Sequence, residues 1–174
     1  MSVGIGEIVN AFGLFYDSIW DPRFRLSVNY HAYSERDLNP MVRAFLLGKF
    51  GRVVPETGAV LPGSSTGRGK IDFLIGGVAI EFAVRRPDDS QGKVMPKDNI
   101  TEVKKLLKFH GPSVLVLFDC SKNPVSDEDL ECYREHPSLG KGPHLRSPFS
   151  LAYFYRTSDR ETDVITKRIW ARGR

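Results

Sequence analysis

The sequence predicts an α/β fold in which a mixed central sheet is flanked by helices. Apolar residues recur at helical spacing over residues 5–20 and 34–50, and the pattern then changes to that of strands. Gly-Gly at 76–77 separates two short apolar runs, which is typical of a two-residue hairpin turn. Residues 113–119 (SVLVLFD) form a continuous apolar run, as expected of a strand buried on both faces. Strands that alternate with helices in this way are expected within one α/β domain.

Two helices are predicted in the first 50 residues. The first covers residues 5–20 and has one apolar stripe. The second covers residues 34–50 and has two candidate starts. Ser34 with Asp37 fits a capping box, whereas Asn-Pro at 39–40 fits a cap followed by a first-turn proline.

The remaining elements follow from changes in period and from turn residues. Interruptions by glycine and proline delimit loops, and alternating or continuous apolar runs delimit strands. The predicted order is α-β-β-β-α-β with an N-terminal helix, followed by a short helix and a last strand. We expect a strand at 52–61, a loop at 62–69, strands at 70–75 and 78–85, a polar loop at 86–97, a helix at 98–110, a strand at 113–119, a short helix at 126–135 and a strand at 149–156.

The composition is that of an ordinary globular chain. Of 174 residues, 41% are hydrophobic and 26% are charged, which argues against disorder. No apolar run approaches the roughly 18 residues of a membrane-spanning helix, and the N-terminus lacks the basic start of a signal peptide. With only two cysteines, Cys120 and Cys132, we expect no disulfide framework and a cytoplasmic location.

The net charge of +4 is concentrated in a basic C-terminal tail. Residues 167–174 contain four basic residues and no acid. The rest of the chain balances 21 basic residues against 21 acidic ones. The overall charge is therefore weak support for nucleic-acid binding.

The hairpin around Gly-Gly places two acids opposite each other. If the turn is at 76–77, Asp72 faces Glu81 and Lys70 faces Ala83 on the same side of the sheet. Paired carboxylates repel each other, and a hard divalent cation such as Mg²⁺ reverses the sign of that interaction. Alternatively, both acids are exposed and a neighbouring basic residue neutralises them.

These residues resemble the PD-(D/E)XK phosphodiesterase superfamily, which has the restriction-endonuclease-like fold. Asp72 matches the family aspartate, and Glu81 matches the first residue of the Glu-x-Lys motif. Glu35 is the candidate for the family's helix acid, and Glu56 is a second candidate acid. The resemblance covers about residues 34–120 in element order. It implies a metal-dependent nuclease, with DNA as the favoured substrate.

The resemblance also implies the roles of the site residues. Asp72 and Glu81 would hold Mg²⁺ or Mn²⁺, with Glu35 near a second metal or a metal-bound water. The third motif position is Ala83 where the family has lysine. One interpretation is that Lys70, on the neighbouring strand, supplies the missing charge, with an arginine as the second choice. The other is that the site is degenerate and the fold serves as a nucleic-acid-binding or protein-interaction module.

The resemblance divides the single domain, residues 1–174, into an N-terminal helical extension (1–30), a nuclease-like core (34–156) and the basic tail. Basic residues that follow the motif strand are candidate phosphate contacts. The helix at 5–20 is a candidate homodimer interface. The expected partner is nucleic acid rather than a membrane. The candidate nucleic-acid-binding residues are Arg85, Arg86, Lys93, Lys97 and Lys104.

Overall fold

The fold is built on one six-stranded mixed sheet. The computed structural model describes residues 3–60, 68–135, 139 and 146–170, without the side chains of residues 56–60 and 68–69. The strands are β1 (Val54–Val60), β2 (Arg68–Ile75), β3 (Val78–Arg85), β4 (Ser113–Asp119), β5 (Phe149–Arg156) and β6 (Thr162–Ile169). They lie in the sheet in chain order, from β1 to β6. The three central strands β3, β4 and β5 are parallel to one another, and the other neighbouring pairs are antiparallel.

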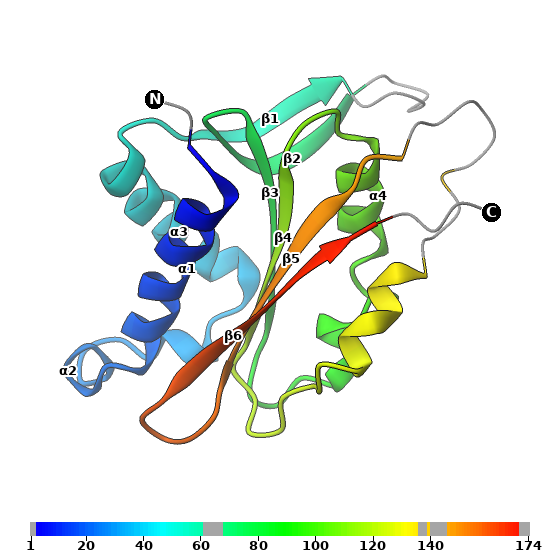
Figure 1. Cartoon of the computed structure of the whole chain (residues 1–174). Coiled ribbons are helices and arrows are strands. Elements are labelled where there is room, and N and C mark those ends of the chain that lie inside the picture. The colour runs from blue at the N-terminus through cyan, green and yellow to red at the C-terminus, as the bar shows by residue number, and fades with distance from the viewer. Residues whose placement is uncertain (1–2, 61–67, 136–138, 140–145, 171–174) are drawn as a thin grey trace.

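Helices cover both faces of this sheet (Figure 1). Helices α1 (Ile5–Trp20) and α3 (Glu35–Phe50) lie on one face. Helix α4 (Ile100–Lys108) and the 3-10 helix η3 (Asp129–Arg134) lie on the other. The shorter helices are α2 (Pro22–Arg25), η1 (Tyr30–Ala32) and η2 (Gln91–Val94). The predicted α/β class with a mixed sheet and an N-terminal helix is therefore confirmed.

The start of α3 decides between the two predicted caps. The backbone N–H of Ser34 donates to the Asp37 carboxylate (3.0 Å), so the capping box begins the helix and Pro40 lies inside it. Gly51 ends α3 with a φ of 71°, in the left-handed region where glycine pays no Cβ penalty. Glu35 is consequently the first residue of α3.

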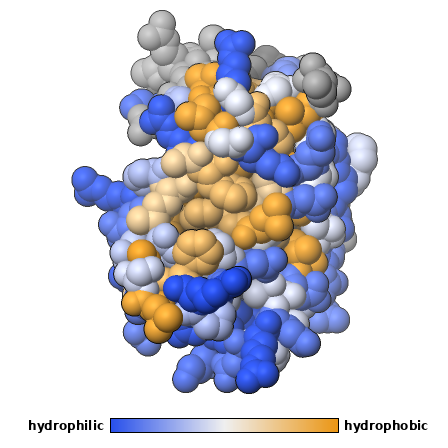
Figure 2. Space-filling model, turned by 90° about the vertical axis from the view of Figure 1, so that its left-hand side faces the viewer, coloured by the Kyte–Doolittle hydropathy of each residue, from blue (hydrophilic) through white to orange (hydrophobic). Residues whose placement is uncertain are grey.

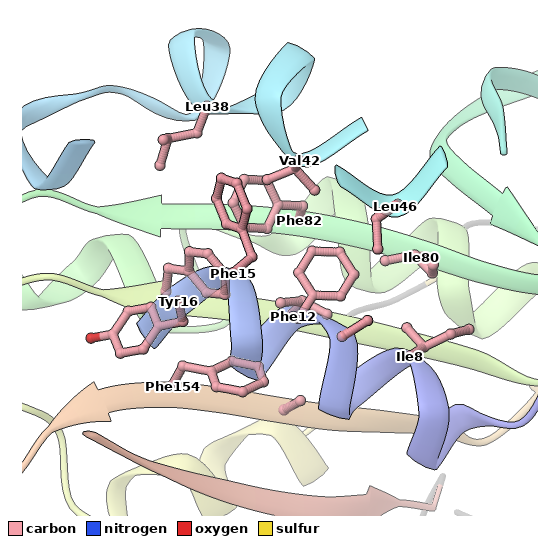
Figure 3. Close-up of a cluster of buried hydrophobic side chains, with 14 of the residues drawn as sticks. Ile8, Phe12, Phe15, Tyr16, Leu38, Val42, Leu46, Ile80, Phe82 and Phe154 are labelled. Atoms are coloured by element: carbon pink, nitrogen blue, oxygen red, sulfur yellow. The ribbon is translucent and has the colours of Figure 1, made fainter. Parts of the chain in front are cut away.

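A large apolar cluster fixes α1 and α3 against the sheet (Figure 3). Phe118 of β4 lies at its centre, with its ring centroid 4.9 Å from that of Phe82 and 4.8 Å from that of Tyr16. Fully burying one large apolar side chain stabilises the fold by about 1.5–3 kcal/mol, so this cluster holds α3 firmly beside β3. The cluster residues labelled in Figure 3 are Ile8, Phe12, Phe15, Tyr16, Leu38, Val42, Leu46, Ile80, Phe82 and Phe154.

Several predicted boundaries differ from the structure. The helix expected at 98–110 is shorter, and the one expected at 126–135 is the 3-10 helix η3. The predicted loop at 62–69 overlaps β2, because Arg68 already pairs with Val60 of β1. Residues 61–67 lie outside the described part of the chain.

Strand β6 was missed by the sequence analysis. It pairs with β5 over its whole length, and most of its side chains are exposed or half-buried, so it lacks a clear apolar alternation. The prediction of a basic tail at 167–174 is therefore wrong for its first three residues, which belong to β6. Lys167, for example, binds Asp127 (2.9 Å) and Glu131 (2.5 Å). Residues 171–174 lie outside the described residues.

The apolar stripe of α1 serves the core. The residues expected at a dimer interface are largely buried against the sheet, and Leu14 on the outer side of α1 is 55% exposed. Apolar surface is visible on this side of the molecule (Figure 2). Helices α2 and α3 also carry the exposed Phe24 and Leu47. A homodimer stays a prediction. Among the helices described, none is both long and apolar enough to cross a membrane.

Candidate active site

Strands β2 and β3 pair only near their turn and then separate. Their register consists of Ile75 with Val78, Leu74 with Ala79, and Phe73 with Ile80, as the Gly-Gly turn predicted. Farther from the turn, β2 remains paired with β1 and β3 remains paired with β4. The expected continuation of the ladder, with Asp72, Ile71 and Lys70 each facing a residue of β3, is therefore wrong.

The separation changes the faces of β2. In a regular strand Ile71 and Phe73 would share one face, but Ile71 packs in the opposite cluster, on the α4 side of the sheet. Once β2 has left β3, its side chains no longer follow the alternation that the hairpin imposes. Asp72 lies at this departure point.

The carboxylate of Asp72 takes a backbone donor of β3. The N–H of Phe82 donates to Oδ2 of Asp72 at 2.9 Å. This bond anchors the acid across the gap between the two strands, next to Glu81. The charge of Asp72 in turn raises the pKa of Glu81, which indicates that the two carboxyl groups lie near each other.

Glu81 is a fully buried acid that is paired with a lysine from another element. Its side chain is 0% exposed, and its Oε2 lies 2.7 Å from Nζ of Lys105 on α4. Lys105 is itself largely buried, with 19% of its side chain exposed. The other oxygen, Oε1 of Glu81, is buried and has no hydrogen-bond partner among the described residues.

The structure places Lys105, rather than Lys70, at the predicted acid pair. Lys70 pairs with Gly58 of β1 and is exposed, because β2 has left β3 at this point. Ala83 is buried on β3, two residues beyond Glu81. The expected position of Lys70 opposite Ala83 is therefore not formed.

The charged groups of this site change one another's pKa. They are four acids, Glu35, Asp72, Glu81 and Glu102, and one lysine, Lys105. Burial, first of all, raises the pKa of Glu81 well above its usual range, and the charge of Asp72 raises it further. Burial also raises the pKa of Asp72, against the bond from Phe82. The pKa of Lys105 is raised because the acids around it outweigh the lowering effect of burial.

Glu35 joins the cluster from the start of α3. Desolvation, followed by the charges of Asp72 and Glu102, raises the pKa of Glu35 to about 7. Glu35 is an exposed residue and lines a hollow together with Glu102, and its role in the site stays a prediction. Glu102 of α4 was missed by the sequence analysis. The expectation that the helix after β3 packs over the face that carries Glu81 could have indicated both Glu102 and Lys105.

Three of the four acids line two neighbouring hollows, whereas the buried Glu81 lines neither. One, of about 390 Å³, is lined by Glu35, Glu102 and Ala83 together with basic residues. The other, of about 620 Å³, is lined by Asp72 and part of α3. Arg36 lines both hollows. The basic residues at the two hollows are Arg36, Arg43, Arg86 and Lys93.

The predicted phosphate contacts fall into different environments. Arg86 and Lys93 are exposed and line the first hollow, although Arg86 also pairs with Asp89 (2.9 Å). Lys97 is exposed and Lys104 half-buried, and neither lines a hollow at the acids.

Arg85 is buried. Its guanidinium is 3.0 Å from the Asp119 carboxylate and 3.0 Å from the carbonyl of Asn123. These bonds already occupy the guanidinium, so Arg85 does not extend into either hollow as a phosphate contact would. The side chain of Glu56, the second candidate acid, is outside the part of the chain that the structure describes.

The acid pair fits a hard divalent cation. Within the described residues, no group of three or more His, Cys, Asp or Glu side chains is placed to hold a metal ion, so an ion at this acid pair would have two side-chain ligands, Asp72 and Glu81. Mg²⁺ commonly binds one or two carboxylates and keeps several waters. The unpartnered Oε1 of Glu81 beside a second carboxylate is the feature that such an ion would satisfy.

No family model, no curated protein and no solved structure matches this chain.

Proposed function

We propose that this chain is a metal-dependent nuclease of the PD-(D/E)XK type, in which Lys105 replaces the lysine that is absent at position 83. The 2.7 Å contact between Lys105 and Glu81 carries the proposal. It restores, from a helix, the positive charge that the family's strand motif carries beside its acids. The contact lies next to Asp72, where β2 and β3 separate.

Each side chain has a role that its environment supports. Asp72 and Glu81 would hold Mg²⁺ or Mn²⁺, with the backbone carbonyl of Phe82 as a further ligand. The bound ion would lower the pKa of a coordinated water and shield phosphate charge. Lys105 would stabilise the negative charge that develops on the phosphate during hydrolysis. Glu35, with a pKa of about 7, is suited to accept a proton from water near neutral pH.

The basic residues at the two hollows, which alternate with acids that include Asp89 and Asp98, are candidate contacts for a polyanionic substrate. Arg36 and Arg43 lie on α3, and Arg86 and Lys93 line the first hollow from the segment that follows β3. Positively charged side chains that contact phosphates supply much of nucleic-acid affinity. We therefore propose nucleic acid as the substrate, with DNA as the first to be tested.

A cleavage assay tests this proposal. Single- and double-stranded DNA and RNA would be incubated with the protein in Mg²⁺, Mn²⁺ or EDTA. We expect metal-dependent cleavage that Asp72→Asn abolishes, because asparagine keeps the bond from Phe82 but weakens metal binding. Asp88→Asn, at an exposed acid that lines neither hollow, is the matched control and should cleave normally. Absence of cleavage on every substrate would contradict the nuclease.

The second candidate function is a nucleic-acid-binding module without catalysis. It is favoured by Ala83 at the motif position and by the lack of a three-residue metal cluster among the described residues. Calorimetry separates the two functions. The module predicts no Mg²⁺ binding by the wild type and nucleic-acid binding that survives Asp72→Asn. The nuclease predicts Mg²⁺ binding that this substitution removes.

A further inference from the structure

A third pocket lies at the end of the sheet where β3, β4 and β5 finish. It has a volume of about 470 Å³. Helix α2 and the turn between β5 and β6 are at this same end of the molecule (Figure 1). Its charged and aromatic lining residues are Trp20, Arg25, His31, Lys122, Arg156 and Asp159.

The charge of this pocket is positive. Three cations line it, and the one carboxylate among the lining residues, Asp159, lies 2.9 Å from Arg156. The side chain of Asp159 is fully exposed, whereas that of Arg156 is only 16% exposed. An ion pair whose carboxylate is fully in solvent is weak, so an incoming anion can compete with Asp159 for the guanidinium.

An aromatic platform orients the basic groups. The guanidinium carbon of Arg156 lies 4.2 Å from the centroid of the Trp20 ring, and that of Arg25 lies 5.9 Å from it. Stacking on an aromatic face holds a guanidinium plane while leaving its N–H groups available at the edge. The two arginines come from α2 and β5, so the pocket exists only in the folded protein.

His31 provides an unsatisfied group at this site. Its ring stacks on Trp20, with a centroid distance of 5.3 Å, and its Nδ1 is buried without a hydrogen-bond partner among the described residues. Burial, followed by the charges of Arg25 and Arg156, lowers the pKa of His31. A buried polar atom that makes no hydrogen bond costs free energy, which a bound acceptor would recover.

We propose that this pocket binds a phosphate group. Phosphate oxygens match the donor fork of arginine and bind it through charge-assisted hydrogen bonds. An anion would reverse the local field at His31, so that the protonated imidazole donates to the ligand. The pocket thereby acquires two arginines, a lysine and a histidine as donors around one ligand.

The source of this phosphate follows from the proposed nuclease function, on which this step rests: the phosphate belongs to the nucleic-acid substrate. Arg86 lines the first hollow at the acids, and the next residue, Pro87, lines this pocket. One strand of nucleic acid that crosses this segment would contact both sites. The pocket would then set which phosphodiester bond reaches the acids.

Histidine NMR tests the pocket without relying on activity. The Asp72→Asn protein would be titrated with inorganic phosphate, then with oligonucleotides of one sequence carrying either a 5′-phosphate or a 5′-hydroxyl. We expect the His31 resonances to shift saturably and the pKa of His31 to rise on binding. Tighter binding of the phosphorylated oligonucleotide would identify a terminal phosphate, and equal binding would identify a backbone phosphate.

Matched substitutions complete the test. Arg156→Gln and Arg25→Gln should each weaken phosphate binding by about tenfold or more. Arg25 is exposed, so its replacement leaves the packing of the core intact. Arg160→Gln, which lies nearby but does not line the pocket, should leave phosphate binding unchanged. Absence of a His31 shift with every phosphate ligand, or equal affinity in all three variants, would overturn the pocket.

The two proposals fail in different ways. Phosphate binding at His31 without cleavage of any substrate would support the phosphate site and contradict the proposed nuclease function. Cleavage that is lost in Asp72→Asn but has the same rate and cut position in Arg156→Gln and Arg25→Gln would keep the nuclease and overturn the role of the pocket.

Discussion

Nζ of Lys105 lies 2.7 Å from Oε2 of Glu81, although the two residues are on a helix and a strand. The pair is largely buried and stands beside a second acid, Asp72. A buried charge is tolerated when it is paired and hydrogen-bonded. The position of α4 over β3 therefore matters as much to this site as the strand register does.

Replacing Lys105 tests its role directly. Lys105→Met keeps most of the apolar stem and removes the charge, so we expect the cleavage rate to fall about 100- to 1,000-fold. Lys70→Met, at an exposed position of β2, should change the rate less than about threefold. Circular dichroism of both variants checks folding. A large loss in Lys70→Met with normal cleavage by Lys105→Met would reverse the assignment.

Moving the lysine back to the strand should rescue the activity. Ala83 is on the same strand as Glu81, two residues away, and lines the first hollow. We expect the double variant Lys105→Met/Ala83→Lys to cleave at least about tenfold faster than Lys105→Met alone, because its ammonium again neutralises the acids. The rates of the single and double variants, measured on one substrate, decide this. Ala83→Leu in the same background is the control for volume and should give no rescue.

The buried acid makes stability depend on pH. The pKa of Glu81 is raised in the folded protein from an ordinary value near 4.5, so the folded state holds this proton more tightly than the unfolded chain. The stabilisation that this bound proton gives to the folded state is complete below the ordinary pKa and is lost as the pH rises through the folded pKa. Without metal, the free energy of unfolding of Glu81→Gln should therefore increase relative to that of the wild type by at least about 1 kcal/mol when the pH is raised from about 5 to about 8.5.

Urea unfolding in EDTA at the two pH values measures this effect. Glu128→Gln, at an exposed acid, is the control and should follow the wild type at both. A difference between wild type and Glu81→Gln that is the same at both pH values would contradict the raised pKa.

Arg85 should matter for stability and its neighbour should not. Arg85→Met breaks a buried ion pair and leaves Asp119 with the Tyr153 hydroxyl (2.6 Å) and the Ser121 N–H (2.9 Å), at a cost of about 3–5 kcal/mol. Arg86→Met removes an exposed pair with Asp89 and should leave stability nearly unchanged. Chemical denaturation of both variants measures this. Equal stability of the two proteins would show that the Asp119 network does not need its arginine.

The local pattern predicted the acids but not their counter-charge. Gly-Gly, the alternation of the hairpin and the apolar run of β4 are short-range signals, and they indicated that Asp72 and Glu81 would be neighbours. Lys105 is 24 residues from Glu81 in the chain, and its contact depends on how α4 packs across the sheet. Strand periodicity carries no information about that packing.

The same limit explains the other differences. The separation of β2 from β3 is set by tertiary contacts, so the hairpin register held for three pairs and then failed at Asp72. The edge strand β6 was missed because its side chains face solvent for most of its length.

The three-pair ladder between β2 and β3 has a consequence for the whole sheet. A longer ladder would give the N–H of Phe82 a backbone acceptor, whereas here that donor is bound by Asp72. Strand pairing and the proposed metal site thus compete for one donor. Substitutions that extend the pairing of β2 and β3 should make the sheet more stable and the acids less able to hold an ion. Selection for the proposed function would therefore keep the pairing of these two strands short, at a cost in stability.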